Sequence, residues 1–147
     1  AHKCGVPVNW VGSTNAYNGN AYMGLIGCME QYDKNQIAYR EYIRVKLFDT
    51  LTAGQNYYAS VHVFLAQTSI AACNGIGLFF SQSDMSGYIK HNFPVKPHVY
   101  LLGNPIIDNK NQWQQICGTY TAKGGEQFLI IGNFDCYKKG LSHRQPA

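Results

Sequence analysis

The chain has 147 residues, with 12 basic and 8 acidic side chains, a formal net charge of +4 and only 14% charged residues. This length corresponds to about one domain and can bury a core without help from a metal. Its 7 Phe, 11 Tyr and 2 Trp and its low charge exclude a disordered chain. No apolar run approaches the ~20 residues of a membrane-spanning helix. The basic residues are scattered, so the charge does not indicate nucleic-acid binding.

The first third of the chain is rich in Gly and Asn. Turn signals occur at Gly12-Ser13, Asn18-Gly19 and Gly27. Between these turns, residues 21–26 are predicted as a short strand, and residues 30–38 fit either a helical turn or an ordered loop. Residues 39–47 alternate between apolar and polar side chains, which is typical of a half-buried strand.

The strongest strand pattern follows at residues 56–67. Its inward positions are predicted to be Ala59, Val61, Val63 and Leu65, and its outward positions Tyr58, Ser60, His62 and Phe64. Another strand is predicted at 76–81. The long segment 82–110 contains three prolines that exclude a central strand, although 98–102 fits an edge strand. Long loops in compact domains are often functional.

The last third predicts two strands, 113–122 and 128–134, joined by a hairpin turn at Lys123-Gly124-Gly125-Glu126. Residues 138–147 form a polar tail. Six or seven short strands without helical periodicity predict one all-β domain over residues 1–137, an antiparallel β-sandwich.

Five cysteines are present, at positions 4, 28, 73, 117 and 136. No Cys-x-x-Cys pair indicates a zinc site, and the odd count leaves at least one thiol unpaired. Several of the five also fit a role as small buried apolar residues.

Several segments of the sequence resemble those of a known family. They are residues 39–47, 51–54, 57–61, 75–81, 113–120 and 122–134. Together they resemble the jelly-roll, carbohydrate-binding-module-like domain of Bacteroidetes surface proteins over roughly residues 5–134. In that family the domain often precedes an OmpA-type peptidoglycan-binding domain or belongs to type IX secretion and gliding proteins. The resemblance therefore implies an extracellular or cell-surface location, associated with the outer membrane.

The resemblance also implies two strands that the chain does not contain. Family members usually begin with a strand of the type Asn-Pro-Ser-Phe-Glu and close with one ending Asp-Asp-Val. We therefore expect a jelly roll that lacks its first and last strands, with another chain or segment completing the sheet. Acidic residues of those strands often hold calcium in related modules, so no calcium site is assigned to this chain. His91 and His98 have no third ligand at metal spacing, and no metal or other cofactor is expected.

Catalytic motifs are absent from the sequence. It has no nucleophile elbow, phosphate-binding loop or zinc-protease motif. Most of the acidic residues fall in predicted turns, where turn chemistry explains Asp well. We therefore expect a protein without enzymatic activity.

The candidate ligand-binding residues are aromatic or polar side chains on outward strand positions: Tyr58, His62, Phe64 and Phe79. Aromatic rings can stack on sugars while polar side chains bind the hydroxyls. The alternative is that these side chains form a second packed layer under loops. Trp113 is interpreted as a supporting residue rather than a sugar-stacking one.

The sequence thus predicts a non-catalytic surface module that binds a glycan or a surface protein. Binding would use the aromatic sheet face and the 82–110 loop, which contains Tyr88, Phe93 and Tyr100. The alternative is a structural subunit or cargo of an outer-membrane secretion or gliding complex, with no sugar site.

Overall fold

The computed structural model describes residues 5–32, 38–86 and 95–135. These residues confirm the all-β prediction, because they form ten strands and no helix. Within these three ranges there is therefore no helix that could cross a membrane. The strands are β1 (Val8–Asn9), β2 (Gly12–Ser13), β3 (Met29–Tyr32), β4 (Ala38–Tyr39), β5 (Tyr42–Lys46), β6 (Asn56–Val63), β7 (Ile76–Ser81), β8 (Val99–Tyr100), β9 (Gln114–Thr121) and β10 (Phe128–Asn133).

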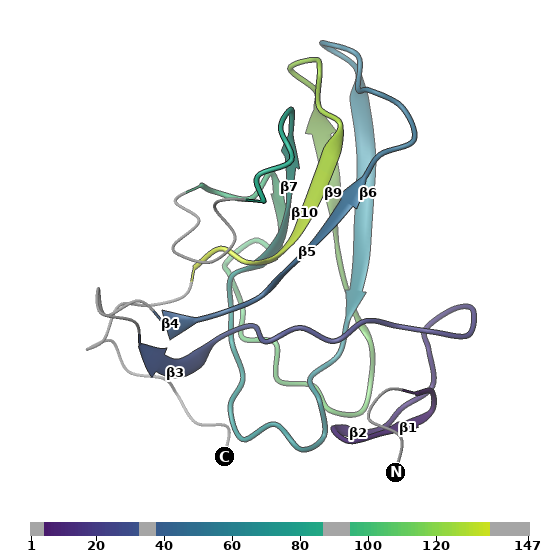
Figure 1. The fold of residues 1–147 in the computed structure, drawn as a ribbon, viewed down its shortest axis with the longest axis vertical. Coiled ribbons are helices and arrows are strands. Elements are labelled where there is room, and N and C mark those ends of the chain that lie inside the picture. Colours follow the sequence, from purple (N-terminus) through teal and green to yellow (C-terminus); the bar gives the residue numbers. More distant parts are fainter. Residues whose placement is uncertain (1–4, 33–37, 87–94, 136–147) are drawn as a thin grey trace.

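Two antiparallel sheets make up the body of the domain (Figure 1). The larger sheet has the order β5-β10-β7-β8, and the second is a long two-stranded ribbon of β6 and β9. We refer to this pair as the ribbon. The predicted edge strand is confirmed, since β8 pairs with β7 at the border of the larger sheet and contacts β9 of the ribbon. The arrangement is consistent with a β-sandwich.

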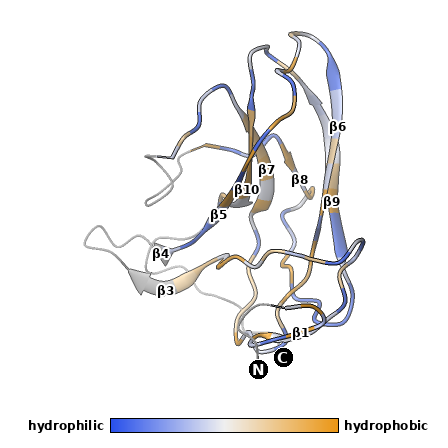
Figure 2. Cartoon of the chain, turned by 45° about the vertical axis from the view of Figure 1, so that its right-hand side comes forward, coloured by the Kyte–Doolittle hydropathy of each residue, from blue (hydrophilic) through white to orange (hydrophobic). Residues whose placement is uncertain are grey.

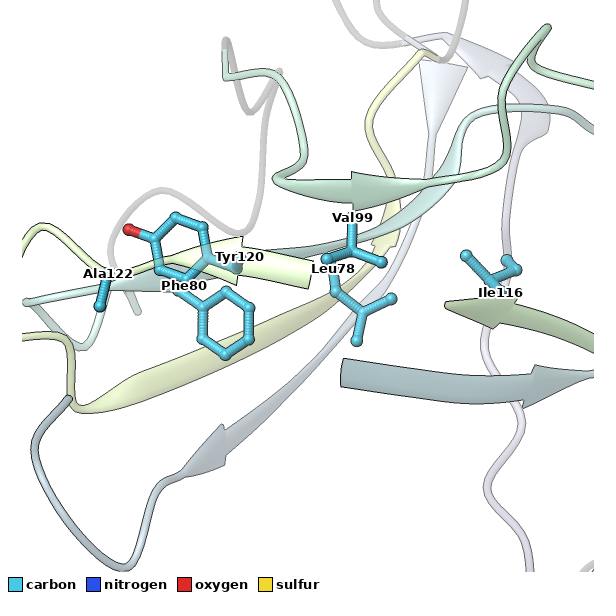
Figure 3. Packing of buried hydrophobic residues seen from close by; sticks show 6 residues of the cluster. All are labelled: Leu78, Phe80, Val99, Ile116, Tyr120 and Ala122. Atoms are coloured by element: carbon cyan, nitrogen blue, oxygen red, sulfur yellow. The ribbon is translucent and has the colours of Figure 1, made fainter. Parts of the chain in front are cut away.

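The core lies between the two sheets and is built from alternate residues of each strand. Figure 3 shows Leu78 and Phe80 of β7 and Val99 of β8 on the side of the larger sheet, with Ile116 and Tyr120 of β9 and the adjacent Ala122. The rings of Phe80 and Tyr120 stack with centroids 4.7 Å apart. Burying a side chain such as Leu78 or Ile116 contributes about 1.5–3 kcal/mol. The predicted inward residues Ala59, Val61 and Val63 pack against this cluster.

Two segments in the first third differ from the sequence predictions. Residues 21–26 form no strand; instead, the Glu41 carboxylate accepts the N–H of Ile26 at 2.8 Å, and Ile26 O accepts the Glu41 N–H. The segment is therefore held by single contacts of Ile26 and Tyr22 rather than by a strand ladder. At the other segment, residues 30–32 belong to β3 and residue 38 to β4, and the two strands pair antiparallel with an irregular register. These ends of the predicted helical turn or loop are therefore strand, while residues 33–37 lie outside the described residues.

The hairpin prediction at residues 123–126 is wrong. Strand β9 pairs with β6, whereas β10 pairs with β5 and β7, so the connection crosses from the ribbon to the larger sheet. Gly124 and Gly125 do adopt the positive φ angles, 97° and 86°, that the glycine pair indicates. However, Gly125 N donates to Leu51 O, and Leu51 N donates to Glu126 O, so the turn docks on residue 51 instead of closing a hairpin.

Glu126 stabilises this crossover from inside. Its buried carboxylate accepts hydrogen bonds from Tyr120 Oη at 2.5 Å and from the backbone N–H groups of Lys123 at 2.8 Å and Gly124 at 2.9 Å. Burial opposes ionisation, but these hydrogen bonds together lower the pKa of Glu126 below its ordinary value. Burial and the bond to Glu126 raise the pKa of Tyr120 to about 12. The loop is thus fixed by an ionised carboxylate.

Candidate functional site

The outer side of the ribbon presents a surface without charged side chains. Because the side chains of a strand alternate, every second residue of β6 and β9 points away from the core. Most of the outward residues are exposed, and none carries a formal charge. They are Asn56, Tyr58, Ser60 and His62 on β6, and Gln115, Cys117, Thr119 and Thr121 on β9. We call this surface the ribbon face.

Tyr58 is the most exposed aromatic residue of the ribbon face, with 67% of its surface accessible. It lies directly opposite Thr119. A hydrogen bond with the Cys117 thiol raises the pKa of its hydroxyl above the ordinary value. On the neighbouring pair, Thr121 Oγ1 donates to Asn56 Oδ1 at 2.7 Å. Tyr58 therefore stands as an open ring among small hydrogen-bonding side chains.

His62 lies at the end of the ribbon face that corresponds to the C-terminal end of β6. Its ring stacks on Tyr17 from the N-terminal segment, with centroids 3.5 Å apart and planes 12° apart. Tyr17 itself is 60% exposed. The outer surface at this point is consequently a tyrosine stacked on a histidine rather than a bare histidine.

Phe64 lies just beyond β6 and is a packing residue. Its ring contacts Trp113 at a centroid distance of 5.4 Å, and Trp113 meets Tyr22 edge-on at 5.6 Å. Trp113 Nε1 also donates to Asn15 O at 3.1 Å. Both Trp113 and Phe64 thus hold the N-terminal segment against the end of the ribbon, which is the supporting role interpreted from the sequence for Trp113.

Phe79 belongs to the other side of the molecule. It lies on the outer face of the larger sheet, between Ile130 of β10 and the edge strand, and stacks on His98 at 4.6 Å. This face is covered: Ile130 has no accessible surface. At Gly77 a Cβ atom would lie 2.6 Å from Pro97, so the chain before β8 passes close over the sheet. Phe79 therefore does not share a surface with Tyr58 and His62.

His98 lies at the edge of the larger sheet, where its ring contacts both Phe79 of the outer face and Tyr120 of the core. Its Nδ1 accepts the N–H of Phe80 at 3.0 Å, and its ring stacks on Tyr120 at 4.4 Å. Burial and the positive charge of Lys123 lower the pKa of His98, although Glu126 acts in the opposite direction. The ring is thus held in its neutral form, with Nδ1 occupied by the backbone.

The cysteines fall into two chemical states. Cys28 is disulfide-bonded, whereas Cys73 and Cys117 carry free thiols. Burial raises the pKa of the Cys73 thiol, so that thiol is protonated at neutral pH. Within the three described ranges, no three His, Cys, Asp or Glu side chains come together as a metal site.

The predicted contact loop 82–110 is described only in part. Tyr100 on the edge strand β8 is 47% exposed. Tyr88, Phe93 and His91 lie outside the described residues, as does the predicted tail at 138–147.

The sequence predictions missed half of the ribbon face. Gln115, Cys117 and Thr119 belong to it because of the strand register, in which Tyr58 faces Thr119 and His62 faces Gln115. An alternation pattern on β9 could have identified these outward positions, but not their partners on β6. Nothing in the sequence indicates that Tyr17 stacks on His62.

Figure 2 shows the difference in polarity between the two sheets. Strands β7 and β10 are mostly hydrophobic, whereas hydrophilic residues occur along β6.

Comparison of the chain with protein-family models, with curated proteins and with solved structures gave no significant match.

Proposed function

We propose that this chain is a non-catalytic binding module of the cell surface or the extracellular space, and that it recognises a glycan on the ribbon face. The observation that carries the proposal is the open Tyr58 ring within an uncharged, hydrogen-bonding surface. Tyr17 stacked on His62 bounds this surface at one end.

The chemistry of the ribbon face suits a sugar. A tyrosine offers a rigid apolar face with a polar end, and an apolar ring can pack on the C–H face of a pyranose. Around it, Ser60, Thr119 and Gln115 are exposed donors and acceptors for sugar hydroxyls. Since the face carries no formal charge, a neutral glycan fits it better than an anionic one.

The same surface supports binding rather than hydrolysis. Glycoside cleavage usually requires two carboxyl groups on either side of the bond. The eight residues of the ribbon face include no Asp or Glu. A ligand bound at Tyr58 would therefore be held without being cut.

The disulfide at Cys28 supports the proposed location, because disulfides form and persist mainly in oxidising compartments. A surface protein as ligand would use the same open Tyr58 ring. A purely structural role in an outer-membrane complex is a distinct function that would not require this ring to stay open.

A glycan array that includes neutral polysaccharide and peptidoglycan fragments tests the proposal. We expect binding that is lost in Tyr58→Ala and weakened in His62→Ala. Tyr39→Ala is the matched control, since Tyr39 is an exposed tyrosine on the separate pair of strands β3 and β4. Absence of any glycan binding, or equal binding by wild type and Tyr58→Ala, would contradict the proposal.

A further inference from the structure

The outer edge of β6 is an unpaired edge of unusual character. Among the described residues, β6 pairs only with β9, so the backbone groups on its other side have no strand partner. The strand is eight residues long and contains no charge, no Pro and no Gly. Proteins normally protect such edges with charged residues, prolines, bulges or very short strands.

Strand β5, at the edge of the larger sheet, is protected against pairing with another chain. It is only five residues long and carries Arg44 and Lys46. If β5 paired with a second β5, these cations would lie near their own copies, and like charges across two strands are destabilising. The two edges are therefore not equivalent, since β5 resists pairing and β6 does not.

We propose that β6 pairs antiparallel with β6 of a second copy of this chain. The product is a continuous sheet in the order β9-β6-β6-β9. A two-fold axis brings identical strands together, and self-pairing of β6 meets no charge repulsion. The other strand of the ribbon, β9, is uncharged too but lies against β8. The two-stranded ribbon becomes a four-stranded sheet, equal in strand number to the sheet that it faces.

The alternation of β6 restricts the register of this pairing. Directly opposite residues point to the same side of a sheet, so ribbon-face residues must lie opposite ribbon-face residues. A two-fold axis at Ser60 satisfies this rule. It places Tyr57 opposite Val63 and Ala59 opposite Val61, and the first of these is a favourable aromatic and β-branched pair. A two-fold axis at Ala59 would also pair Tyr57 with Val61, but it would leave two alanines opposite each other at the axis.

The pairing would join two ribbon faces into one surface of twice the width. Tyr58 of each copy would then lie opposite His62 of the other. This assembly does not depend on the proposed glycan binding, because it uses the edge of β6 rather than its outer side chains.

Sedimentation analysis over a range of protein concentrations tests the pairing. We expect a reversible dimer for the wild type and a several-fold higher dissociation constant for Ser60→Lys and for Ser60→Glu. Mixing these two variants should restore the dimer, since opposite charges then meet at the axis. Thr119→Lys adds the same charge to the same face on β9, and we expect it to leave the dimer unchanged.

Hydrogen exchange keeps the test independent of how well the variants fold. In the wild type, the alternate amides of residues 57–63 whose N–H groups point away from β9 should become more protected as concentration rises, while those of β5 should not. A protein that stays monomeric, or a dimer that Ser60→Lys leaves intact with no concentration-dependent protection in β6, would overturn the proposal.

Discussion

The ribbon face and the outer face of the larger sheet carry the same kind of residue and have opposite environments. Tyr58 and Phe79 are both aromatic side chains on outward strand positions. Tyr58 is two-thirds exposed, whereas Phe79 stacks on His98 beside the fully buried Ile130. Two contacts of the chain around β8 contribute to the difference: His98 stacks on Phe79, and Pro97 lies close to the sheet at Gly77. An outward aromatic residue is thus a binding candidate only where no other segment covers it.

The largest effect expected from this comparison is at Ile130. Its side chain points outward from the larger sheet but has no accessible surface, so Ile130→Ala leaves a cavity in a packed layer. We expect a loss of about 2–5 kcal/mol in the free energy of unfolding, measured by urea denaturation. A loss below about 1 kcal/mol would mean that this face is as open as the ribbon face.

Gly77→Ala tests how closely the chain segment before β8 packs on the larger sheet. The added Cβ would lie 2.6 Å from Pro97 Cβ and 2.8 Å from Val99 O, so the covering segment must shift. We expect a destabilisation of about 1–3 kcal/mol in the same assay. Gly24→Ala is the control, because no atom lies within 4 Å of its added Cβ, and its stability should stay the same or rise slightly.

The stability of the covered face should also depend on pH through His98. The folded protein lowers the pKa of this residue below 6.5, so folding favours the neutral ring. The resulting stabilisation is complete above pH 6.5 and is lost as the pH falls through the folded pKa. The difference in unfolding free energy between wild type and His98→Phe should therefore be constant above pH 6.5 and shrink in more acidic solution. A difference that does not change with pH would contradict this account.

Tyr58→Ala should have the smallest effect on stability. Its ring is largely solvated, so the free energy of unfolding should change by no more than about 0.5 kcal/mol. Thermal or urea unfolding checks this value beside Ile130→Ala. A loss comparable to that of Ile130→Ala would place Tyr58 in a packed layer and remove the contrast between the two faces.

Much of this fold could be predicted from periodicity. Strand β7 matches the predicted range 76–81, and β6, β9 and β10 differ from their predictions only at the ends. The connection at Gly124-Gly125 could not be predicted, because positive φ angles serve a hairpin and a crossover equally well. The backbone hydrogen bonds of Leu51 with Gly125 and Glu126 decide between the two, and these residues are distant in sequence.

The candidate site could be predicted only in part, for a similar reason. Alternation correctly placed Tyr58 and His62 on the outward side of β6, but accessibility depends on segments that pack from elsewhere. Tyr17 covers His62, Trp113 contacts Phe64, and His98 covers Phe79. No local pattern in the sequence encodes these three contacts.

Mapping a bound neutral oligosaccharide by amide chemical shifts tests the central claim most directly. A glycan identified on the array would be titrated into labelled wild-type protein and into Tyr58→Ala. We predict shifts confined to residues 56–62 and 115–121, none at 128–133, and no saturable shifts in Tyr58→Ala. Shifts centred on β10 and Phe79, or an unchanged response in Tyr58→Ala, would contradict a binding site on the ribbon face.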